Sequence, residues 1–401
     1  MARLFRPVAL ALAAALVIAA CSSGDGDGDA DVAASEDADG SFVTVPQVES
    51  SPAEDVVSAL DSPRDGSFPT PIVDPDALLS GGPPPDGIPS IDEPKFLRAG
   101  DVDFLEDQEP VLALTVGDES RAYPVQILIW HELVNDTLDG VPVTVSYCPL
   151  CNSAIAYDRR IDDRVLDFGT SGMLYNSALV MYDRQTESLW SHFTGQAIIG
   201  ALTGTELEIF PMTTVSWAQW REANPDALVL SRETGHSRNY GVNPYPGYDD
   251  VGQSPFLFDG EVDGRLAAKQ RVVGIERGGE SVAIVTEHLA VEDVIEVDVG
   301  GSPVVVWSTE GTASALDRAT VSDGRDVGAT GAFQPVVDGQ ALTFTADGDG
   351  FVDDQTGSRW NVFGEAVSGS LSGERLTKVE HVDTFWFAWA AFRPDTTIVD
   401  A

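Results

Sequence analysis

Two cysteines separated by two residues are the side chains of this sequence best suited to chemistry. Cys148 and Cys151 lie in the segment YCPLCN, and the chain holds only one other cysteine, Cys21. With no distant thiol to pair with, the two can bind a metal ion, alternate between dithiol and disulfide, or remain free. A purely structural disulfide would close too short a loop to stabilise the fold much. The spacing therefore predicts a chemical site at this segment.

A metal site at the two thiols would need further ligands, and two histidines are the main candidates. His131 stands in the segment WHELVND, and His236 stands in the segment TGHSRN. Thiolate and imidazole ligands suit copper, zinc or iron, and both histidines together with both thiols would close a tetrahedral centre. His192 is a weaker candidate, because a surface position fits it equally well. A buried structural role for His131 and an ordinary loop at His236 are the alternatives.

Five neighbours of these residues in the sequence are candidates for lining the same site. The segment 232–261, which contains His236, combines aromatic and polar residues in a loop-like stretch suited to covering a site. The residues expected to line the site are Trp130, Glu132, Asn152, Arg238 and Tyr240.

Two other functions fit the same residues. The first is a metal-free thiol–disulfide redox protein, in which the two cysteines cycle between dithiol and disulfide. The second is a lipoprotein that binds a ligand or a partner beneath the segment 232–261 without catalysis. The sequence contains no GxSxG, HExxH or phosphate-binding loop in a convincing context, so whether the chain is an enzyme stays open.

The elements around the cysteines favour a metal knuckle over a thioredoxin-type motif. A β-rich run at 141–147 precedes the cysteines, and residues 154–168 are expected to form a hairpin. A turn between strands can direct two thiolates at one ion, whereas a thioredoxin motif opens a long helix. Helices are expected at 124–134 and 216–223, each followed by turn residues.

The chain contains an internal duplication that separates residues needed for folding from residues that could do chemistry. Residues 119–154 align without gaps on residues 280–315, at a constant offset of 161. The second copy has Thr309 and Thr312 in place of the two cysteines, and it has no histidine in place of His131. Features present in both copies are explained by the fold, so those confined to one copy are candidates for function.

These patterns predict an α+β, mostly β fold with two pseudo-repeated β-rich domains and few short helices. The expected division of the chain is a lipoprotein signal peptide at 1–20, a disordered Asp/Gly/Pro-rich linker at 21–94, a first repeat with the CPLC site at 95–231, a connecting loop at 232–261 and a degenerate second repeat at 262–401.

The N-terminus and the charge balance indicate where the protein acts. The run LVIAAC at 16–21 resembles a lipobox, so we expect lipidation of Cys21 and an exported protein anchored at the outer face of a bacterial membrane. The chain carries 65 acidic and 23 basic residues, a net charge of -42, which leaves no basic patch for nucleic acid. The expected partners are the membrane, through the lipid, and an unidentified redox or metal-donor partner.

Four segments of the sequence resemble a known family. The strings WHELVND, SYCPLCNSA, MYDRQTESLW and TGHSRNYGVNPYPGYD are similar to those of a bacterial and archaeal family catalogued as domain of unknown function 3179. The resemblance covers most of residues 95–300, and the second copy is the more divergent part. It implies an exported domain built around these motifs, and it transfers no activity.

Overall fold

A computed structural model describes residues 35–36 and 42–399 of the protein. The predicted signal peptide and the predicted lipidation of Cys21 lie outside the described residues. Within the described residues, no helix is both long and apolar enough to cross a membrane.

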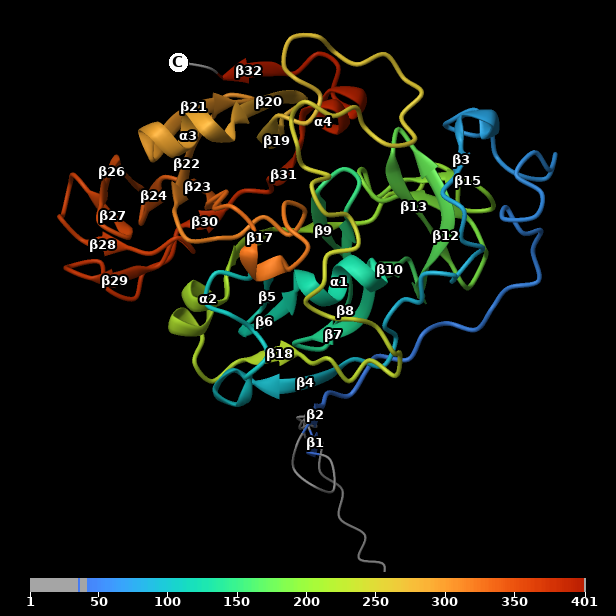
Figure 1. Ribbon diagram of the computed structural model, residues 1–401, viewed down its shortest axis with the longest axis horizontal. Helices are drawn as coiled ribbons and strands as arrows, with labels where there is room; N and C mark the ends of the chain where they lie inside the picture. Colours follow the sequence, from blue (N-terminus) through green and yellow to red (C-terminus); the bar gives the residue numbers. More distant parts are fainter. Residues whose placement is uncertain (1–34, 37–41, 400–401) are drawn as a thin grey trace, which may run out of the picture. The chain divides into compact units, whose positions relative to one another are not determined.

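Three sheets and a short ribbon form the first half of the described chain (Figure 1). The largest sheet has the order β1 (Ser35–Glu36), β2 (Val43–Thr44), β4 (Lys95–Arg98), β18 (Leu228–Leu230), β6 (Glu119–Pro124), β5 (Pro110–Val116) and β17 (Met212–Ser216). The second sheet has the order β16 (Ile209–Phe210), β9 (Ser153–Asp158), β8 (Val141–Cys148) and β7 (Leu133–Leu138). The third sheet has the order β15 (Ala197–Ile199), β14 (Leu189–Ser191), β13 (Ala178–Asp183), β12 (Phe168–Tyr175) and β3 (Leu79–Ser80), and the ribbon pairs β10 (Arg160–Ile161) with β11 (Arg164–Val165).

The second half has a similar set of sheets, coloured orange and red in Figure 1. Its first sheet has the order β31 (Val382–Phe385), β19 (Arg271–Arg277), β20 (Glu280–Val285) and β32 (Thr397–Val399). Its second has the order β21 (Val294–Val299), β22 (Ser302–Thr309), β23 (Ala329–Gln334) and β30 (Thr377–Lys378). Its third has the order β26 (Phe344–Asp347), β27 (Gly350–Asp353), β28 (Arg359–Trp360) and β29 (Ala366–Ser368), and a ribbon pairs β24 (Val336–Val337) with β25 (Gln340–Ala341).

Helices are few and short in the described chain, which confirms the predicted α+β, mostly β fold. The four α-helices have seven residues each and are α1 (Val125–His131), α2 (Trp217–Ala223), α3 (Thr286–Glu292) and α4 (Trp386–Phe392). Helix α2 begins at a capping box formed by Ser216 and Gln219. Helix α1 ends because Glu132 adopts a positive φ of 60°, which turns the chain out of the helix. The three 3-10 turns are Pro75–Ala77, Ala99–Asp101 and Val321–Asp323.

The duplication read from the sequence is visible in the backbone. The elements β5, β6, α1, β7 and β8 reappear as β19, β20, α3, β21 and β22, each exactly matched in length at the same offset of 161. In both halves the strand after the last helix pairs in parallel, β18 with β6 and β32 with β20. Asp293, which corresponds to Glu132, ends α3 with a φ of 61°. The two copies therefore fold alike, including the strained residue that ends each helix.

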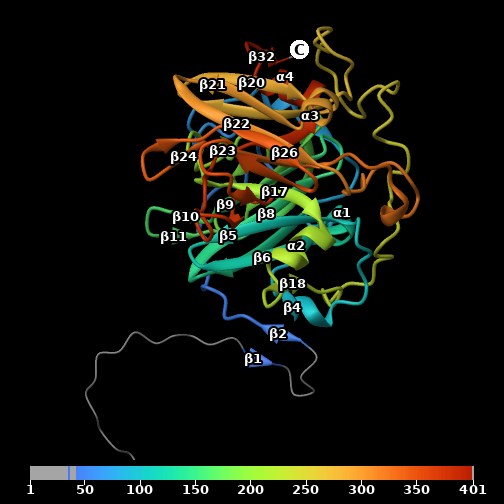
Figure 2. The same ribbon diagram turned by 90° about the vertical axis from the view of Figure 1, so that its left-hand side faces the viewer.

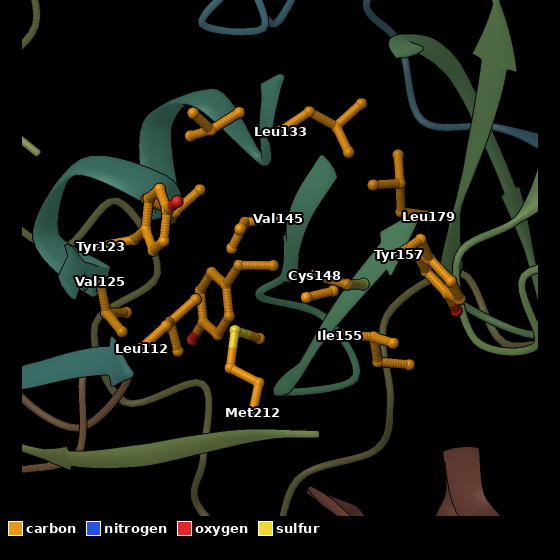
Figure 3. Close-up of a cluster of buried hydrophobic side chains, with 14 of the residues drawn as sticks. Leu112, Tyr123, Val125, Leu133, Val145, Cys148, Ile155, Tyr157, Leu179 and Met212 are labelled. Atoms are coloured by element: carbon orange, nitrogen blue, oxygen red, sulfur yellow. The ribbon is translucent and has the colours of Figure 1, made fainter. Parts of the chain in front are cut away.

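The two halves pack directly on each other within one compact unit. Strand β31 contacts β9, and β17 contacts β23. In Figure 2 the orange and red sheets of the second half lie above the cyan and green sheets of the first. One hydrophobic core includes residues of both halves, from Leu112 and Cys148 to Phe385 and Trp389. Figure 3 shows Cys148 among the apolar side chains of this core.

The segment 42–94 differs from the disordered linker expected over 21–94. It follows the first half as an extended chain, and β3 pairs with β12 while β2 pairs with β4. Val48 N–H donates to Thr137 Oγ1 at 2.9 Å, and Ala59 is fully buried. A chain rich in proline and polar residues cannot form its own core, but an extended backbone can satisfy the open edges of existing sheets. The prediction of disorder is therefore wrong for these residues.

A buried ion pair links this segment to the core of the first half. The Asp136 carboxylate accepts from Arg121 Nη1 at 2.6 Å and from the Tyr123 hydroxyl at 2.7 Å, and both charged side chains are inaccessible to solvent. Gln47 Nε2, on the extended segment, donates to the same carboxylate at 3.1 Å.

We expect Asp136→Asn to lower the free energy of unfolding by about 3 kcal/mol, because the buried Arg121 would lose its buried counter-charge and keep only the partly exposed Glu119. Urea denaturation followed by tryptophan fluorescence measures this change. Asp74→Asn is the control, since Asp74 pairs with Arg64 at the surface and its loss should cost less than about 1 kcal/mol. Equal effects of the two substitutions would contradict the prediction.

Candidate functional site: a buried thiol pair in a hairpin turn

The two cysteines lie at the two sides of one tight turn between β8 and β9. Cys148 is the last residue of β8 and pairs across the hairpin with Ser153, the first residue of β9. Asn152 closes the turn with a φ of 50°, a conformation that asparagine tolerates better than most residues. The strand expected before the cysteines is therefore present, whereas the hairpin expected over 154–168 is reduced to the ribbon of β10 and β11, because β9 pairs with β8 instead. Both cysteines are buried, with 1% and 0% of their surface exposed.

The Cys148 sulfur is surrounded by hydrogen-bond donors. Burial opposes the ionisation of Cys148. Its effect is outweighed by hydrogen bonds from the Cys151 thiol and from the backbone N–H groups of Cys151, Leu179 and Leu150, so the pKa of Cys148 is lowered. Burial and the adjacent Cys148 sulfur raise the pKa of Cys151 well above its ordinary value. Ionisation is therefore easier at Cys148 than at Cys151.

A third group, His192, is connected to the thiols through serine. Cys151 Sγ lies 3.0 Å from Ser153 Oγ, which lies 2.8 Å from His192 Nε2. On the other side of the ring, His192 Nδ1 lies 2.5 Å from Ser146 Oγ. Burial lowers the pKa of His192 to about 3, so the imidazole is neutral at physiological pH. This is the histidine that the sequence placed last among its candidates, although only the first copy has it and the second has Val362 there.

His131 and His236 form a group separate from the thiols, at the segment 232–261 that contains His236. His131 Nδ1 lies 2.7 Å from the Pro89 carbonyl oxygen, and its Nε2 lies 2.7 Å from the Tyr240 hydroxyl. The ring of His236 has its centroid 5.5 Å from that of His131. Burial lowers the pKa of His131 to about 4. Both ring nitrogens of His131 are therefore already occupied by groups of the protein.

The ligand set expected for a metal ion is not brought together. Among the described residues, no group of three or more histidine, cysteine, aspartate or glutamate side chains could hold a metal ion. The structure places Cys148 and Cys151 side by side and leaves His131 and His236 apart from them. A metal ion at this turn would be held by the two sulfurs.

The five residues expected to line the site divide between these two groups. Glu132 belongs to the thiol group, because burial and the nearby Cys148 sulfur raise its pKa to about 8. Asn152 forms part of the turn itself. The other three lie at the segment 232–261: Tyr240 contacts His131, Trp130 Nε1 donates to the Val242 carbonyl at 3.1 Å, and Arg238 donates to the Ser237 carbonyl at 3.2 Å.

The segment 232–261 covers the thiol turn, as its composition predicted. The Tyr248 hydroxyl donates to the Leu150 carbonyl at 3.1 Å. Ser177, whose carbonyl lies 3.9 Å from Cys148 Sγ, donates through its hydroxyl to the Phe256 carbonyl at 2.5 Å. No regular helix or strand is found between β18 and β19. The covering segment is therefore held by a few hydrogen bonds and aromatic contacts.

The second half closes the site from the other side. The Cys151 carbonyl oxygen accepts from the Phe385 N–H at 3.1 Å and from the Thr384 hydroxyl at 2.8 Å. Neither residue could be linked to the cysteines from sequence alone, because more than 230 residues separate them. The corresponding turn of the second half carries no thiol chemistry, because Thr309 and Thr312 replace the two cysteines. Thr309 accepts a hydrogen bond there from Gln219 Nε2 at 2.8 Å.

Residues 85–396 match the family described as protein of unknown function (DUF3179). The chain belongs to this family. The match includes both copies, the thiol turn and the covering segment, so the family is defined by the whole duplicated body rather than by the first copy. No curated protein and no solved structure matches the chain.

The raised pKa of Glu132 predicts a specific pH dependence of stability. A carboxyl group whose pKa is about 8 in the folded state and about 4.5 when unfolded contributes stability below pH 4.5, and that contribution is lost as the pH rises toward 8. Glu132→Gln should therefore flatten this part of the stability profile, by up to several kcal/mol, since one pKa unit is worth about 1.4 kcal/mol.

The measurement is urea denaturation of both proteins between pH 5 and 8.5. Asp293→Asn is the matched control, because Asp293 occupies the same backbone position in the second copy but is exposed. A profile for Glu132→Gln that parallels the wild type across this range would contradict the prediction.

Proposed function

We propose that Cys148 and Cys151 form a thiol–disulfide redox site. The observation that carries this proposal is the position of two free cysteines at one tight turn, where the pKa of Cys148 is lowered and that of Cys151 is raised. A thiolate is the nucleophile in thiol–disulfide exchange, and an adjacent thiol can resolve the mixed disulfide. The exported, lipid-anchored location expected from the N-terminus belongs to the same proposal, since disulfide chemistry persists outside the cytoplasm.

The proposed exchange uses a partner protein that carries a disulfide, and it requires the covering segment 232–261 to move off the turn, because both thiols are buried. The Cys148 thiolate attacks one sulfur of that disulfide, a mixed disulfide forms, and the first sulfur of the partner leaves as a thiolate. This thiolate takes the proton of Cys151. The Cys151 thiolate then attacks Cys148 Sγ and releases the second thiolate of the partner. The partner is reduced by two electrons, and the turn is oxidised to a disulfide.

Hydrogen bonds support the second step of this exchange. Ser153 Oγ lies 3.0 Å from Cys151 Sγ and can donate to the thiolate that forms there. The neutral His192 imidazole holds Ser153 in place from the other side, at 2.8 Å. His192 is thus a positioning residue, and it takes no proton in the exchange because burial keeps its pKa low.

Redox titration of the chain tests the proposal. Protein carrying Cys21→Ser is equilibrated in dithiothreitol buffers of graded potential, and it is then unfolded in the presence of maleimide. The number of thiols labelled per chain should change by two at a single midpoint potential. Cys148→Ser and Cys151→Ser should each abolish the transition. Two thiols that stay labelled at every potential would contradict the proposal. His192→Leu should shift the midpoint and leave the number of reacting thiols at two.

Metal binding through the two sulfurs is the second candidate function, and the donors around Cys148 favour it. Backbone N–H groups that point at a cysteine sulfur support thiolate ligands as well as nucleophiles. Copper, zinc or iron should then be found in the reduced, metal-loaded wild type and be absent from the Cys148→Ser, Cys151→Ser double variant. Equal, near-zero metal in the two proteins would exclude this function.

A further inference from the structure

The covering segment 232–261 has an anchored part and a projecting tip. In the anchored part, the Asp249 carboxylate lies 3.2 Å from Arg271 and 2.9 Å from Arg325. Residues 251–262, which we call the tip, are all described and contain no helix or strand. In Figure 2 the yellow loops that include the tip project beyond the sheets. The tip is therefore the part of the cover that another protein meets first.

Phe256 connects the tip to the thiol turn by two routes through its backbone. Its N–H donates to the Tyr248 hydroxyl at 3.2 Å, and that hydroxyl donates to the Leu150 carbonyl of the turn. Its carbonyl accepts from the Ser177 hydroxyl at 2.5 Å, and the Ser177 carbonyl lies 3.9 Å from the Cys148 sulfur. A displacement of Phe256 therefore releases both residues that join the tip to the turn.

The tip is otherwise held by few contacts. Over the described residues 254–262, the two hydrogen bonds of Phe256 are the only ones. Phe258 adds a ring contact, with its centroid 5.2 Å from that of Phe387 on α4. Leu257 adopts a φ of 48°, a conformation that is costly for a leucine and that the chain can leave when the tip moves. Opening of the tip is therefore opposed only weakly.

The tip presents apolar side chains to solvent. The Phe256 ring is 54% exposed, although its backbone is tied to the turn, and Val251 and Val262 are 37% and 39% exposed. Exposed apolar residues that gather at one place are typical of protein contacts, in which aromatic side chains are frequent anchors. A hollow of about 400 Å³ at the tip is lined by the apolar side chains of Val251, Pro255, Phe258, Val262 and Ala268, together with Gln253 and Ser254.

The charge of this region favours a basic partner. Residues 239–264 contain five acidic residues and no basic residue. Asp249 and Asp263 pair with arginines. Charge of one sign beside an apolar surface selects a partner of the opposite sign. The other three carboxylates are exposed and form no ion pair among the described residues: Asp250, Asp259 and Glu261.

We propose that the partner protein of the thiol–disulfide exchange docks on the tip, through an apolar side chain flanked by lysine or arginine residues. This docking surface rests on the proposed exchange, because it serves the same thiols. The partner binds the displaced tip better than the closed one, since only the displaced tip lets its disulfide reach Cys148. Phe256 is then a specificity-determining residue, which contacts the partner and takes no part in the sulfur chemistry.

Binding is measured first, without exchange. The full chain with its three cysteines replaced by serine is titrated against dye-labelled cyclic peptides, each closed by one disulfide, and fluorescence anisotropy reports the affinity. A peptide with one leucine between two arginines should bind about tenfold more tightly than a peptide with serine in place of the leucine, because burial of a large apolar side chain provides at least that factor. A peptide with glutamates in place of the arginines should bind more weakly as well.

Three variants assign the binding to the tip. Phe256→Ser keeps the backbone hydrogen bonds of the residue and should weaken the arginine peptide about tenfold. Val367→Ser is the matched control, because Val367 is 56% exposed on β29, and it should bind as the wild type does. Asp259→Lys combined with Glu261→Lys should reverse the preference, so that the glutamate peptide binds more tightly than the arginine peptide.

Exchange is measured next, with the reduced chain carrying Cys21→Ser. Phe256→Ser should slow the reduction of the arginine peptide about tenfold and leave the reduction of bis(hydroxyethyl) disulfide, a small neutral compound, at the wild-type rate. Val367→Ser should change neither rate.

The outcomes separate the docking surface from the redox function. The docking surface is overturned if the three peptides bind equally, or if Phe256→Ser and Val367→Ser have the same effect. It is also overturned if Phe256→Ser abolishes self-association of the chain but leaves peptide binding unchanged, since the tip would then bind a second copy. Selective binding without reduction of any disulfide would instead contradict the redox function while supporting the docking surface.

Discussion

The burial of the CPLC turn between the two halves is the constraint on which the rest of the site depends. A turn exposes backbone carbonyl groups, and burial away from water requires that each finds a donor. The Leu150 carbonyl finds Tyr248 of the covering segment, and the Cys151 carbonyl finds Thr384 and Phe385 of the second half. The thiol site is therefore assembled by the whole duplicated body, although both of its cysteines come from one copy.

The same burial sets the charges of the groups around the sulfurs. Removal from water favours the neutral form, so it raises the pKa of Glu132 to about 8 and lowers that of His192 to about 3. Cys148 departs from this trend, because three backbone N–H groups and one thiol converge on its sulfur. Of the two sulfurs, that of Cys148 is therefore the easier to ionise, as the proposed exchange requires.

The two copies keep one scaffold and differ in chemistry. Asp183 and Asp353 each accept a hydrogen bond from the indole nitrogen of a tryptophan, at 2.9 and 3.0 Å, and this duplicated contact is structural. The thiols and His192 belong to the first copy, while Arg271, which pairs with Asp249, and His381 belong to the second. The second repeat is therefore degenerate only with respect to the thiols. It contributes its own polar groups to the interface.

The local pattern of the sequence determined the mostly β fold, the strand that leads into the cysteines and the helices near 125–131 and 217–223, because turn residues and strand periodicity act over short distances. The hairpin expected over 154–168 is reduced to the ribbon of β10 and β11, because β9 pairs with β8 and β16. The sequence also located the thiol site, since the duplication marked the cysteines as confined to one copy. Only the tertiary structure decided which histidine meets the thiols. Ser146 lies on β8 and His192 lies in the turn after β14, far from it in sequence, whereas His131, nearer to the cysteines in sequence, contacts Pro89 and Tyr240. Long-range packing likewise placed residues 42–94 against the sheets, because the partners of an extended chain lie outside that chain.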